Sequence, residues 1–162
     1  MLKSQIAHKI KHREVPNDEF YTPELLSHYL VGQVETRSGD IVLDSAYGGG
    51  SFYKNYPRYV IKKQTSDFYN WKEKVDWIIT NPPYSDLEEW LKHSCEVCEK
   101  GFAYLLGINN LTPRRIKMCE DAGFGITKIH LCKVFKWFGI SAFIIWEKNA
   151  KSIINYDRVV WR

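Results

Sequence analysis

The tetrapeptide Asn81-Pro82-Pro83-Tyr84 directly follows a predicted strand, residues 75–80. Each proline fixes its own φ at about −65° and favours an extended conformation for the residue before it, so this loop is rigid before any ligand arrives. A rigid turn accounts for the two prolines. It does not account for the polar Asn and the aromatic Tyr on either side of them, which could offer a ligand a hydrogen-bonding group and a flat ring.

A second segment of this kind, from Asp44 to Gly50, directly follows the apolar residues 41–43. Its three consecutive glycines would let the backbone approach a ligand closely, and the carboxylate of Asp44 can accept hydrogen bonds from an amine or a hydroxyl. A tight connection between a strand and a helix explains the same glycines equally well. The segment lacks the Gly-Lys-Ser/Thr sequence of a phosphate-binding P-loop.

Alternating strands and helices must position these two loops. The predicted strands are residues 41–44, 59–61, 75–80, 102–106, 126–134 and 141–146, and residues 159–161 are compatible with a docking strand. Helices are predicted at residues 23–31 with Thr22 as N-cap, from about Ser51, from Ser85 as N-cap to Glu99 with Gly101 after it, and from Thr112 as N-cap to Gly123. This alternation indicates an α/β fold with a mostly parallel sheet, and the last two strands, joined by residues 135–139, form an antiparallel hairpin. In such a sheet, ligands bind at the carboxyl ends of the strands, where both loops lie.

The two loops, in this order, resemble the gamma-type amino-group methyltransferases, which transfer a methyl group from S-adenosylmethionine to adenine N6 in nucleic acids. The motif Asn/Asp-Pro-Pro-Tyr/Phe/Trp of this family matches residues 81–84 completely. Residues 19–23 are similar to its upstream cofactor motif, residues 44–52 to its Asp-Pro-Phe-x-Gly-x-Gly loop, and residues 66–68 to its Asp-Phe pair for the cofactor adenine. The resemblance covers about residues 19–148 and implies a Rossmann-like class I methyltransferase fold.

The resemblance also implies roles for individual residues. Those implied to bind the cofactor are Phe20, Tyr21, Thr22, Pro23, Asp44, Ala46, Gly48, Gly50, Asp67 and Phe68, and those implied in catalysis are Asn81, Pro82, Pro83 and Tyr84. The lone pair of an exocyclic amino nitrogen is delocalised into the purine ring, and acceptors at the Asn81 side chain and the Pro82 carbonyl would favour its localised form. Tyr84 would stack on the base, which must be flipped out of a duplex. This chemistry needs no metal and no nucleophilic Ser or Cys.

The sequence departs from the family pattern at three places. Ser45 stands where the family has Pro, Tyr47 stands where it has a small residue, and residues 61–65 lack the carboxylate that binds the cofactor ribose. Only 17 positions separate Gly50 from Asp67, which predicts a trimmed second strand and helix. An inactive subunit that keeps the fold therefore stays open as an alternative.

Aromatic and basic residues alternate in the predicted hairpin. Related enzymes place an aromatic ring there that covers the second face of the target base, and Trp137 and Phe138 are the candidates, unless this is a hydrophobic turn packed on the core. Lys133 and Lys136 are predicted to attract nucleic-acid phosphates. Arg114, Arg115 and Lys117 are predicted to form a solvated helix face.

The length, charge and cysteine content of the chain limit its domain organisation, its partners and its cellular compartment. The 162 residues predict one methyltransferase domain over 1–162, with 1–18 as a basic N-terminal arm and no separate target-recognition domain. Residues 1–16 and 111–162 are net basic around an acidic middle, which fits either a polyanionic partner or a solvated surface. The four cysteines predict reduced thiols in the cytoplasm, and the spacing of Cys95 and Cys98 inside a predicted helix, without a second pair, argues against a metal site. No apolar run is long enough to cross a membrane.

We therefore expect a S-adenosylmethionine-dependent enzyme that methylates adenine N6 in nucleic acid, DNA more than RNA, with short loops, the basic ends or a protein partner for specificity. Glutamine methyltransferases of translation release factors use the same Asn-Pro-Pro-Tyr motif, but they carry a helical domain ahead of the cofactor loop, and only 43 residues precede Asp44. The other alternative is a non-catalytic nucleic-acid-binding subunit.

Overall fold

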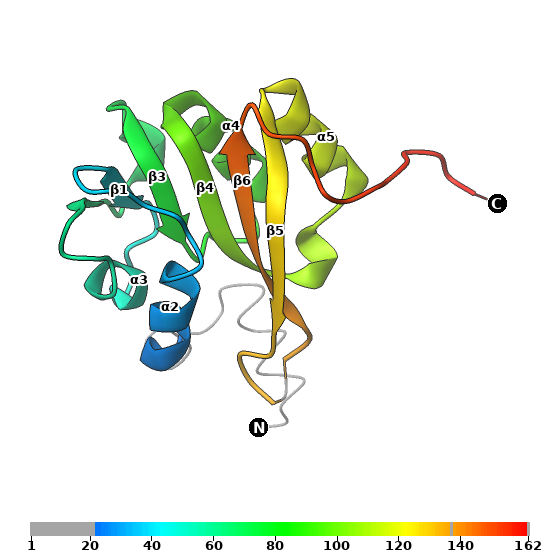
Figure 1. The fold of residues 1–162 in the computed structure, drawn as a ribbon. Coiled ribbons are helices and arrows are strands. Elements are labelled where there is room, and N and C mark those ends of the chain that lie inside the picture. Colours follow the sequence, from blue (N-terminus) through cyan, green and yellow to red (C-terminus); the bar gives the residue numbers. More distant parts are fainter. Residues whose placement is uncertain (1–21, 137, 162) are drawn as a thin grey trace.

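The computed structural model describes residues 22–136 and 138–161 of the chain. In this part, one sheet has the strand order β2-β1-β3-β4-β6-β5. The strands are β1 (Ile41–Asp44), β2 (Ile61–Gln64), β3 (Val75–Thr80), β4 (Cys98–Gly107), β5 (Phe124–Cys132) and β6 (Ser141–Lys148). The first four are parallel, and β6 runs antiparallel to both β4 and β5 (Figure 1). The predicted parallel sheet with an antiparallel hairpin at its end is confirmed.

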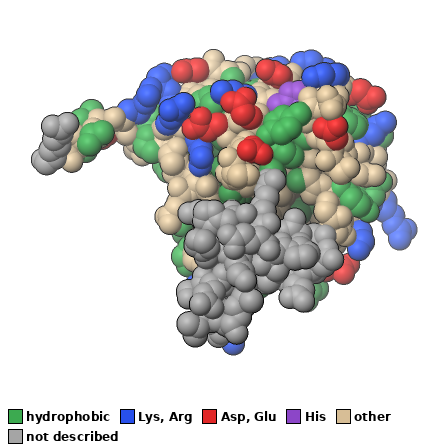
Figure 2. Space-filling model, turned by 180° about the vertical axis from the view of Figure 1, so that it is seen from behind, with side chains coloured by type: hydrophobic (Ala, Val, Ile, Leu, Met, Phe, Trp, Pro, Cys, Tyr) green, Lys and Arg blue, Asp and Glu red, His purple; other side chains and the backbone are tan. Residues whose placement is uncertain are grey.

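Helices cover both faces of the sheet. They are α2 (Glu24–Val31), α3 (Ser51–Lys54), α4 (Leu87–Val97) and α5 (Pro113–Asp121), with 3₁₀ turns η2 (Phe68–Asn70) and η3 (Ile108–Asn110). In Figure 1, α2 and α3 lie in front of the sheet and α4 and α5 lie behind it. Seen from behind, acidic and basic side chains are interspersed over this second face (Figure 2). The result is a three-layer α/β domain.

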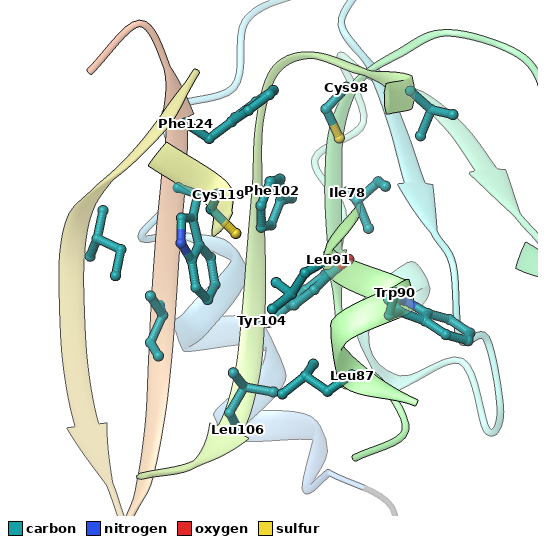
Figure 3. Packing of buried hydrophobic residues seen from close by; sticks show 14 of the residues in the cluster. Ile78, Leu87, Trp90, Leu91, Cys98, Phe102, Tyr104, Leu106, Cys119 and Phe124 are labelled. Carbon is teal, nitrogen blue, oxygen red and sulfur yellow. The ribbon is translucent and has the colours of Figure 1, made fainter. Parts of the chain in front are cut away.

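Alternate residues of β4 face opposite sides of the sheet, because successive side chains of a strand point in opposite directions. Phe102, Tyr104 and Leu106 pack with the buried residues of α4 and α5, and Figure 3 shows these three side chains on one side of the strand. Ala103 and Leu105 pack with the buried residues of α2 and α3. A strand buried on both faces explains why this segment is continuously apolar.

The predicted end of the third helix is wrong. The helix α4 ends at Val97 rather than at Glu99, its N-cap is Asp86 rather than Ser85, and β4 begins at Cys98. Gly101 lies inside β4 instead of ending the helix, and a Cβ there would lie 2.2 Å from the carbonyl oxygen of Trp146. Pairing with the neighbouring strands therefore overrides the helical pattern of these residues.

The segment between β1 and β3 is short. The strand β2 has four residues and begins at Ile61 rather than Tyr59, α3 has one turn, and only η2 separates β2 from β3. The predicted trimming of this segment is confirmed. The strand β2 is an edge strand of the sheet.

The C-terminal segment crosses the start of β5. The N–H of Ile153 donates to the carbonyl of Ile126, and the N–H of Ile126 donates to the Ser152 hydroxyl. The end of the C-terminal segment leads away from the sheet and its helices (Figure 1). The predicted docking strand at residues 159–161 is wrong, because these residues form no strand and Trp161 is 80% exposed.

Candidate functional site

A cavity of about 800 Å³ lies at the carboxyl ends of β1, β3 and β4. Most of the residues singled out by the sequence line it: Thr22, Asp44, Ala46, Gly48, Gly50, Asp67, Phe68, Asn81, Pro82, Pro83, Tyr84 and Phe138. Pro23, Lys133 and Lys136 do not line the cavity and are exposed. Phe20, Tyr21 and Trp137 lie outside the described residues. The loops after β1 and β3 therefore share one cavity, as their positions at the strand ends predict.

Asp44 ends β1 and is 1% exposed. Its Oδ1 accepts hydrogen bonds from the Thr80 hydroxyl at 2.6 Å and from the Ala46 N–H at 3.3 Å. Burial raises the pKa of this carboxyl to about 6, although these hydrogen bonds and one from the Tyr53 N–H lower it. Asp44 is therefore mainly ionised at pH 7, and a carboxylate at this depth favours a cation beside it.

The glycines after Asp44 are required by the backbone. Gly48 and Gly50 have φ of 49° and 75°, in the left-handed region that favours glycine. A Cβ at Gly50 would also lie 3.0 Å from the ring of Tyr47. The N–H of Tyr47 donates to the carbonyl of Thr65, which fastens the loop to the end of β2. The loop is thus tightly folded and still lines the cavity.

Ser45, which stands where the methyltransferases that the sequence resembles have a proline, links the loop to α4. It is fully buried, and its hydroxyl accepts a hydrogen bond from Trp90 Nε1 at 3.1 Å. A proline offers no side-chain acceptor, so this bond needs the serine. Nothing in the sequence indicated this pairing, because it joins residues 45 positions apart.

Asn81 is half-buried at the end of β3, and its Nδ2 donates to the Thr22 hydroxyl oxygen at 3.4 Å. The predicted role of Thr22 as N-cap of α2 is wrong, because the N-cap is Pro23 and no side chain caps this helix. By contrast, the Thr112 side chain caps α5 through the Arg115 N–H, as predicted.

Two aromatic rings converge on Gly107, the last residue of β4. A Cβ on Gly107 would lie 3.9 Å from Tyr84 Cε2 and 3.8 Å from Phe138 Cε1. Burial raises the pKa of Tyr84 to about 12, although a hydrogen bond from the Gly107 backbone lowers it. The Tyr84 hydroxyl therefore stays protonated. Gly107 was not singled out by the sequence, because its place between the rings depends on how two distant loops meet.

The other end of the cavity lies over the residues after β2. Asp67 is exposed, and its Oδ2 accepts from Asn70 Nδ2 at 2.7 Å. Phe68 is 1% exposed, with its ring centroid 4.9 Å from that of Trp90. Phe68 is therefore part of the core as well as of the cavity wall. Tyr69, which the sequence did not indicate, also lines the cavity and is 43% exposed.

The cavity wall beyond β4 is supported by an arginine. Arg115 Nη1 donates to the Asn110 backbone carbonyl at 2.9 Å, and Asn110 Nδ2 donates to the Gly107 carbonyl at 3.3 Å. The prediction of a solvated basic face holds for Arg114, whose side chain is 72% exposed, but it is wrong for Arg115, at 20%. Asn109-Asn110 directly follow a strand, as Asn81 does, and this position was the feature of the sequence that could have indicated this part of the cavity wall.

Among the described residues of the cavity wall, every charged group is acidic. These groups are Asp44, Asp67 and Asp86, and the described lining residues include no Lys or Arg. The wall therefore favours a ligand with positive charge. In the described part of the chain, no three His, Cys, Asp or Glu side chains gather closely enough to hold a metal ion. No helix of the described residues has the length and apolar character needed to span a membrane.

No family model matches the chain, and no curated protein matches it. The structure is similar to that of the N-methyltransferase NodS from Bradyrhizobium japonicum WM9 in complex with S-adenosyl-L-homocysteine, with a TM-score of 0.63, 7% identity, and coverage of 91% of this chain and 99% of NodS. It is also similar to a chain of the E. cuniculi Mtq2–Trm112 complex, described as responsible for methylation of the eRF1 translation termination factor (TM-score 0.61, 16% identity, 82% and 99% covered). A third similar structure is the magnesium protoporphyrin IX methyltransferase ChlM from Synechocystis PCC 6803 with bound S-adenosylmethionine (TM-score 0.58, 13% identity, 89% and 83% covered). At these identities the likeness is one of fold, and the Rossmann-like class I methyltransferase fold is confirmed.

Proposed function

We propose that the protein is an S-adenosylmethionine-dependent methyltransferase that methylates the N6 amino group of adenine in nucleic acid, with DNA as the favoured substrate. One observation carries the proposal: Asp44 at the end of β1, the glycine-containing loop after it, and the Asn81-Pro82-Pro83-Tyr84 loop after β3 line a single cavity. The bound S-adenosylmethionine of ChlM and the bound S-adenosyl-L-homocysteine of NodS, proteins of the same fold, support the choice of cofactor.

The residues at the β1 end of the cavity fit the cofactor by charge and size. S-adenosylmethionine carries a sulfonium and an ammonium group against one carboxylate, and the charged wall residues are carboxylates. A cavity of about 800 Å³ is within the usual range for a ligand of this size. We assign Asp44, Gly48 and Gly50 to the cofactor, with Asp67 and the edge of Phe68 at the adenine end. The cofactor supplies a methyl group bonded to a positively charged sulfur.

The family's ribose carboxylate has no replacement at the end of β2. Gln64 occupies that place, since it pairs with Asp44 in the β1–β2 register. An amide can still hydrogen-bond a ribose hydroxyl, but without the gain that a charged acceptor gives. We therefore propose an active enzyme with weak cofactor binding, and complete loss of binding would instead support the inactive-subunit alternative.

At the β3 end, Asn81 and Pro82 act on the amino group of the substrate. The Asn81 side-chain oxygen and the Pro82 carbonyl accept hydrogen bonds from the two N–H groups of this amino group. These hydrogen bonds favour a localised lone pair on the nitrogen. The cofactor, when bound, would supply the methyl group to this lone pair, and the electron pair of the broken S–C bond would stay on sulfur. The nitrogen then releases one proton to water. Pro82 and Pro83 keep both acceptors in place, so little reorganisation is needed during the reaction.

The two rings near Gly107 favour a nucleobase over a protein amide. Tyr84 and Phe138 both reach within 4 Å of the same point, where a flat base can contact both. A glutamine side chain has no ring face to stack. It remains the second candidate, because the amide nitrogen has the same delocalised lone pair and the Mtq2–Trm112 complex, which acts on eRF1, has a chain of this fold.

The direct test is incubation with methyl-labelled S-adenosylmethionine and, in parallel, adenine-containing duplex DNA, single-stranded DNA, structured RNA and a translation release factor. A duplex in which purine replaces adenine lacks only the amino group and is the matched control. Label in DNA but not in this control is the expected result. Label in the release factor alone would overturn the nucleobase assignment.

Two variants test the division of roles in the same assay. Asn81→Ala should lose turnover and keep cofactor affinity, whereas Asp44→Ala should lose cofactor binding measured by calorimetry. Equal binding defects in both variants would contradict the assigned roles.

A further inference from the structure

Thr22 makes an unusual contact for a residue at the start of a helix. It is 6% exposed, and its hydroxyl oxygen accepts the hydrogen bond from Asn81 Nδ2 across 59 positions of sequence. Its hydroxyl is not used to cap α2, since the Pro23 carbonyl accepts the Ser27 N–H and no side chain caps the helix. The proline after Thr22 favours an extended backbone at residue 22, which restricts where this hydroxyl can lie.

In this structure the Asn81 amide lies with its Nδ2 end at the Thr22 hydroxyl, and its Oδ1 end is left for the cavity that Asn81 lines. A side-chain amide has a donor end and an acceptor end, and a half-turn of the group exchanges them. When Nδ2 is held by the Thr22 hydroxyl, Oδ1 is the end left for a ligand. The proposed reaction needs that end, because an amino group with two N–H bonds requires acceptors, and a second NH₂ group facing it would repel it.

We propose that Thr22 is a positioning residue for the Asn81 amide: its hydroxyl holds Nδ2 so that Oδ1 faces the amino group that is methylated. The inference rests on the proposed function and assigns Thr22 to the substrate side of the site. It differs from the cofactor role that the family resemblance implies for Thr22. The two roles predict different kinetic defects.

The experiment compares Thr22→Val, which keeps the shape of the side chain but removes the hydroxyl, with Thr22→Ser, which keeps the hydroxyl. For Thr22→Val, kcat should fall about tenfold, the loss expected for one hydrogen bond at the reacting group, while the cofactor Kd from calorimetry stays within about twofold. Thr22→Ser should restore most of kcat and so exclude a defect in folding. An unchanged kcat, a parallel loss of cofactor affinity, or failure of the serine to restore kcat would each overturn the inference.

A second measurement does not depend on methyl transfer. The side-chain NH₂ signals of Asn81 can be assigned in an ¹H–¹⁵N spectrum by their absence in Asn81→Ala. Thr22→Val should move these signals toward the values of a solvated amide, and Thr22→Ser should leave them near their wild-type positions. Unchanged signals in Thr22→Val would overturn the inference even in an active enzyme. A wild-type protein that transfers no methyl group but shows the shift would overturn only the proposed function.

Discussion

Gly107 is a residue at which added volume would reach the proposed substrate end of the cavity. Its φ does not require glycine, and a Cβ there would make ordinary contacts of 3.4 Å with Asn110 Nδ2 and 3.8–3.9 Å with the rings of Phe138 and Tyr84. Gly107→Ala should therefore fold with a stability within about 1 kcal/mol of wild type. The added methyl group would stand where both rings meet the proposed base.

We expect Gly107→Ala to raise the KM for nucleic acid about tenfold or more and to leave the cofactor Kd unchanged, because the residues proposed to bind the cofactor lie at the other end of the cavity. Steady-state kinetics and calorimetry measure the two effects separately. Phe138→Ala should weaken substrate binding in the same way through loss of stacking. A wild-type KM in both variants would place the base elsewhere.

If Asp44 binds the cofactor as proposed, cofactor binding should depend on pH. Its pKa is raised to about 6 by burial, and only the ionised form favours the positive charge of the cofactor. The ionised fraction falls about tenfold between pH 7 and pH 5, so the cofactor Kd should rise by about the same factor. Asp67→Asn should keep this pH dependence, and Asp44→Asn should bind weakly at every pH. A Kd independent of pH in the wild type would show that Asp44 does not contact the charge.

The same carboxyl affects the stability of the free protein, and the sign is opposite to that of a salt-bridged aspartate. Its pKa is raised from 3.8 to about 6, so between these values the folded state binds more protons than the unfolded state. This contribution to the free energy of unfolding therefore falls as pH rises from 4 to 6, by about 3 kcal/mol in total. Asp44→Asn should lack this pH-dependent contribution to the free energy of unfolding. Urea denaturation of both proteins between pH 4 and pH 6 should show that the wild type loses stability relative to the variant as pH rises.

At this scale the sequence indicated the residue types of the site but not all of their partners. Asp44, Asn81 and Tyr84 follow from motif and strand position. The roles of Thr22, Gly107 and Ser45 do not, because each depends on a contact between segments that are far apart along the chain.

The strand β4 connects the site to the core, and its two glycines have different functions. Gly107 lies at the cavity, whereas Gly101 lies near the opposite end, where a Cβ would be 2.2 Å from the Trp146 carbonyl and 2.7 Å from the Trp77 ring. A backbone atom cannot yield as the end of a side chain can.

Gly101→Ala should therefore destabilise the protein by about 3 kcal/mol or prevent folding, whereas Gly107→Ala, the same change on the same strand, should not. Chemical denaturation followed by fluorescence compares the two. Equal stability of both variants would show that β4 and β6 can separate at Gly101.

The elements themselves were largely predictable, since the strands alternate with helices and end at turn residues. Apart from the predicted strand at residues 159–161, which does not form, the errors concern boundaries. Residues 98–101 continue the helical pattern of α4 and end in a glycine, yet Cys98 pairs with Val75 and extends β4 instead. Pairing of β2 likewise moves the strand from residue 59 to residue 61, and only the neighbouring β1 decides this register.

Across the whole molecule, charge separates the cavity from the surface around it. The cavity wall has carboxylates, and Lys133 and Lys136 are exposed in the loop that also carries Phe138. On the face of α4 and α5, basic side chains form ion pairs with acidic ones, as in Lys92–Glu89 and Lys117–Asp121, and both kinds are interspersed on this face (Figure 2). Phosphates are therefore expected at the rim near the β5–β6 loop and not inside the cavity.

Replacing Lys133 and Lys136 by alanine should weaken nucleic-acid binding and reduce the slope of log K against log salt by about 2, one for each lost phosphate contact. The matched control removes two lysines at the other end of the sheet, Lys74 and Lys148, which both lie near Glu99. Binding titrations at several salt concentrations measure the slope. An equal effect of both pairs would indicate a non-specific dependence on net charge.

The strands β1 and β3 separate just before the cavity. Their pairing ends at Leu43 and Ile78, and beyond it the Thr80 hydroxyl bridges to Asp44 through side chains. Thr80 directly precedes Asn81, so a single buried hydrogen bond and one peptide unit join the proposed cofactor carboxylate to the proposed catalytic amide. We expect a ligand that draws Asp44 away from Thr80 to shift Asn81 as well. Such a coupling between the two ligands would be reciprocal, so that each would change the affinity of the other by the same factor.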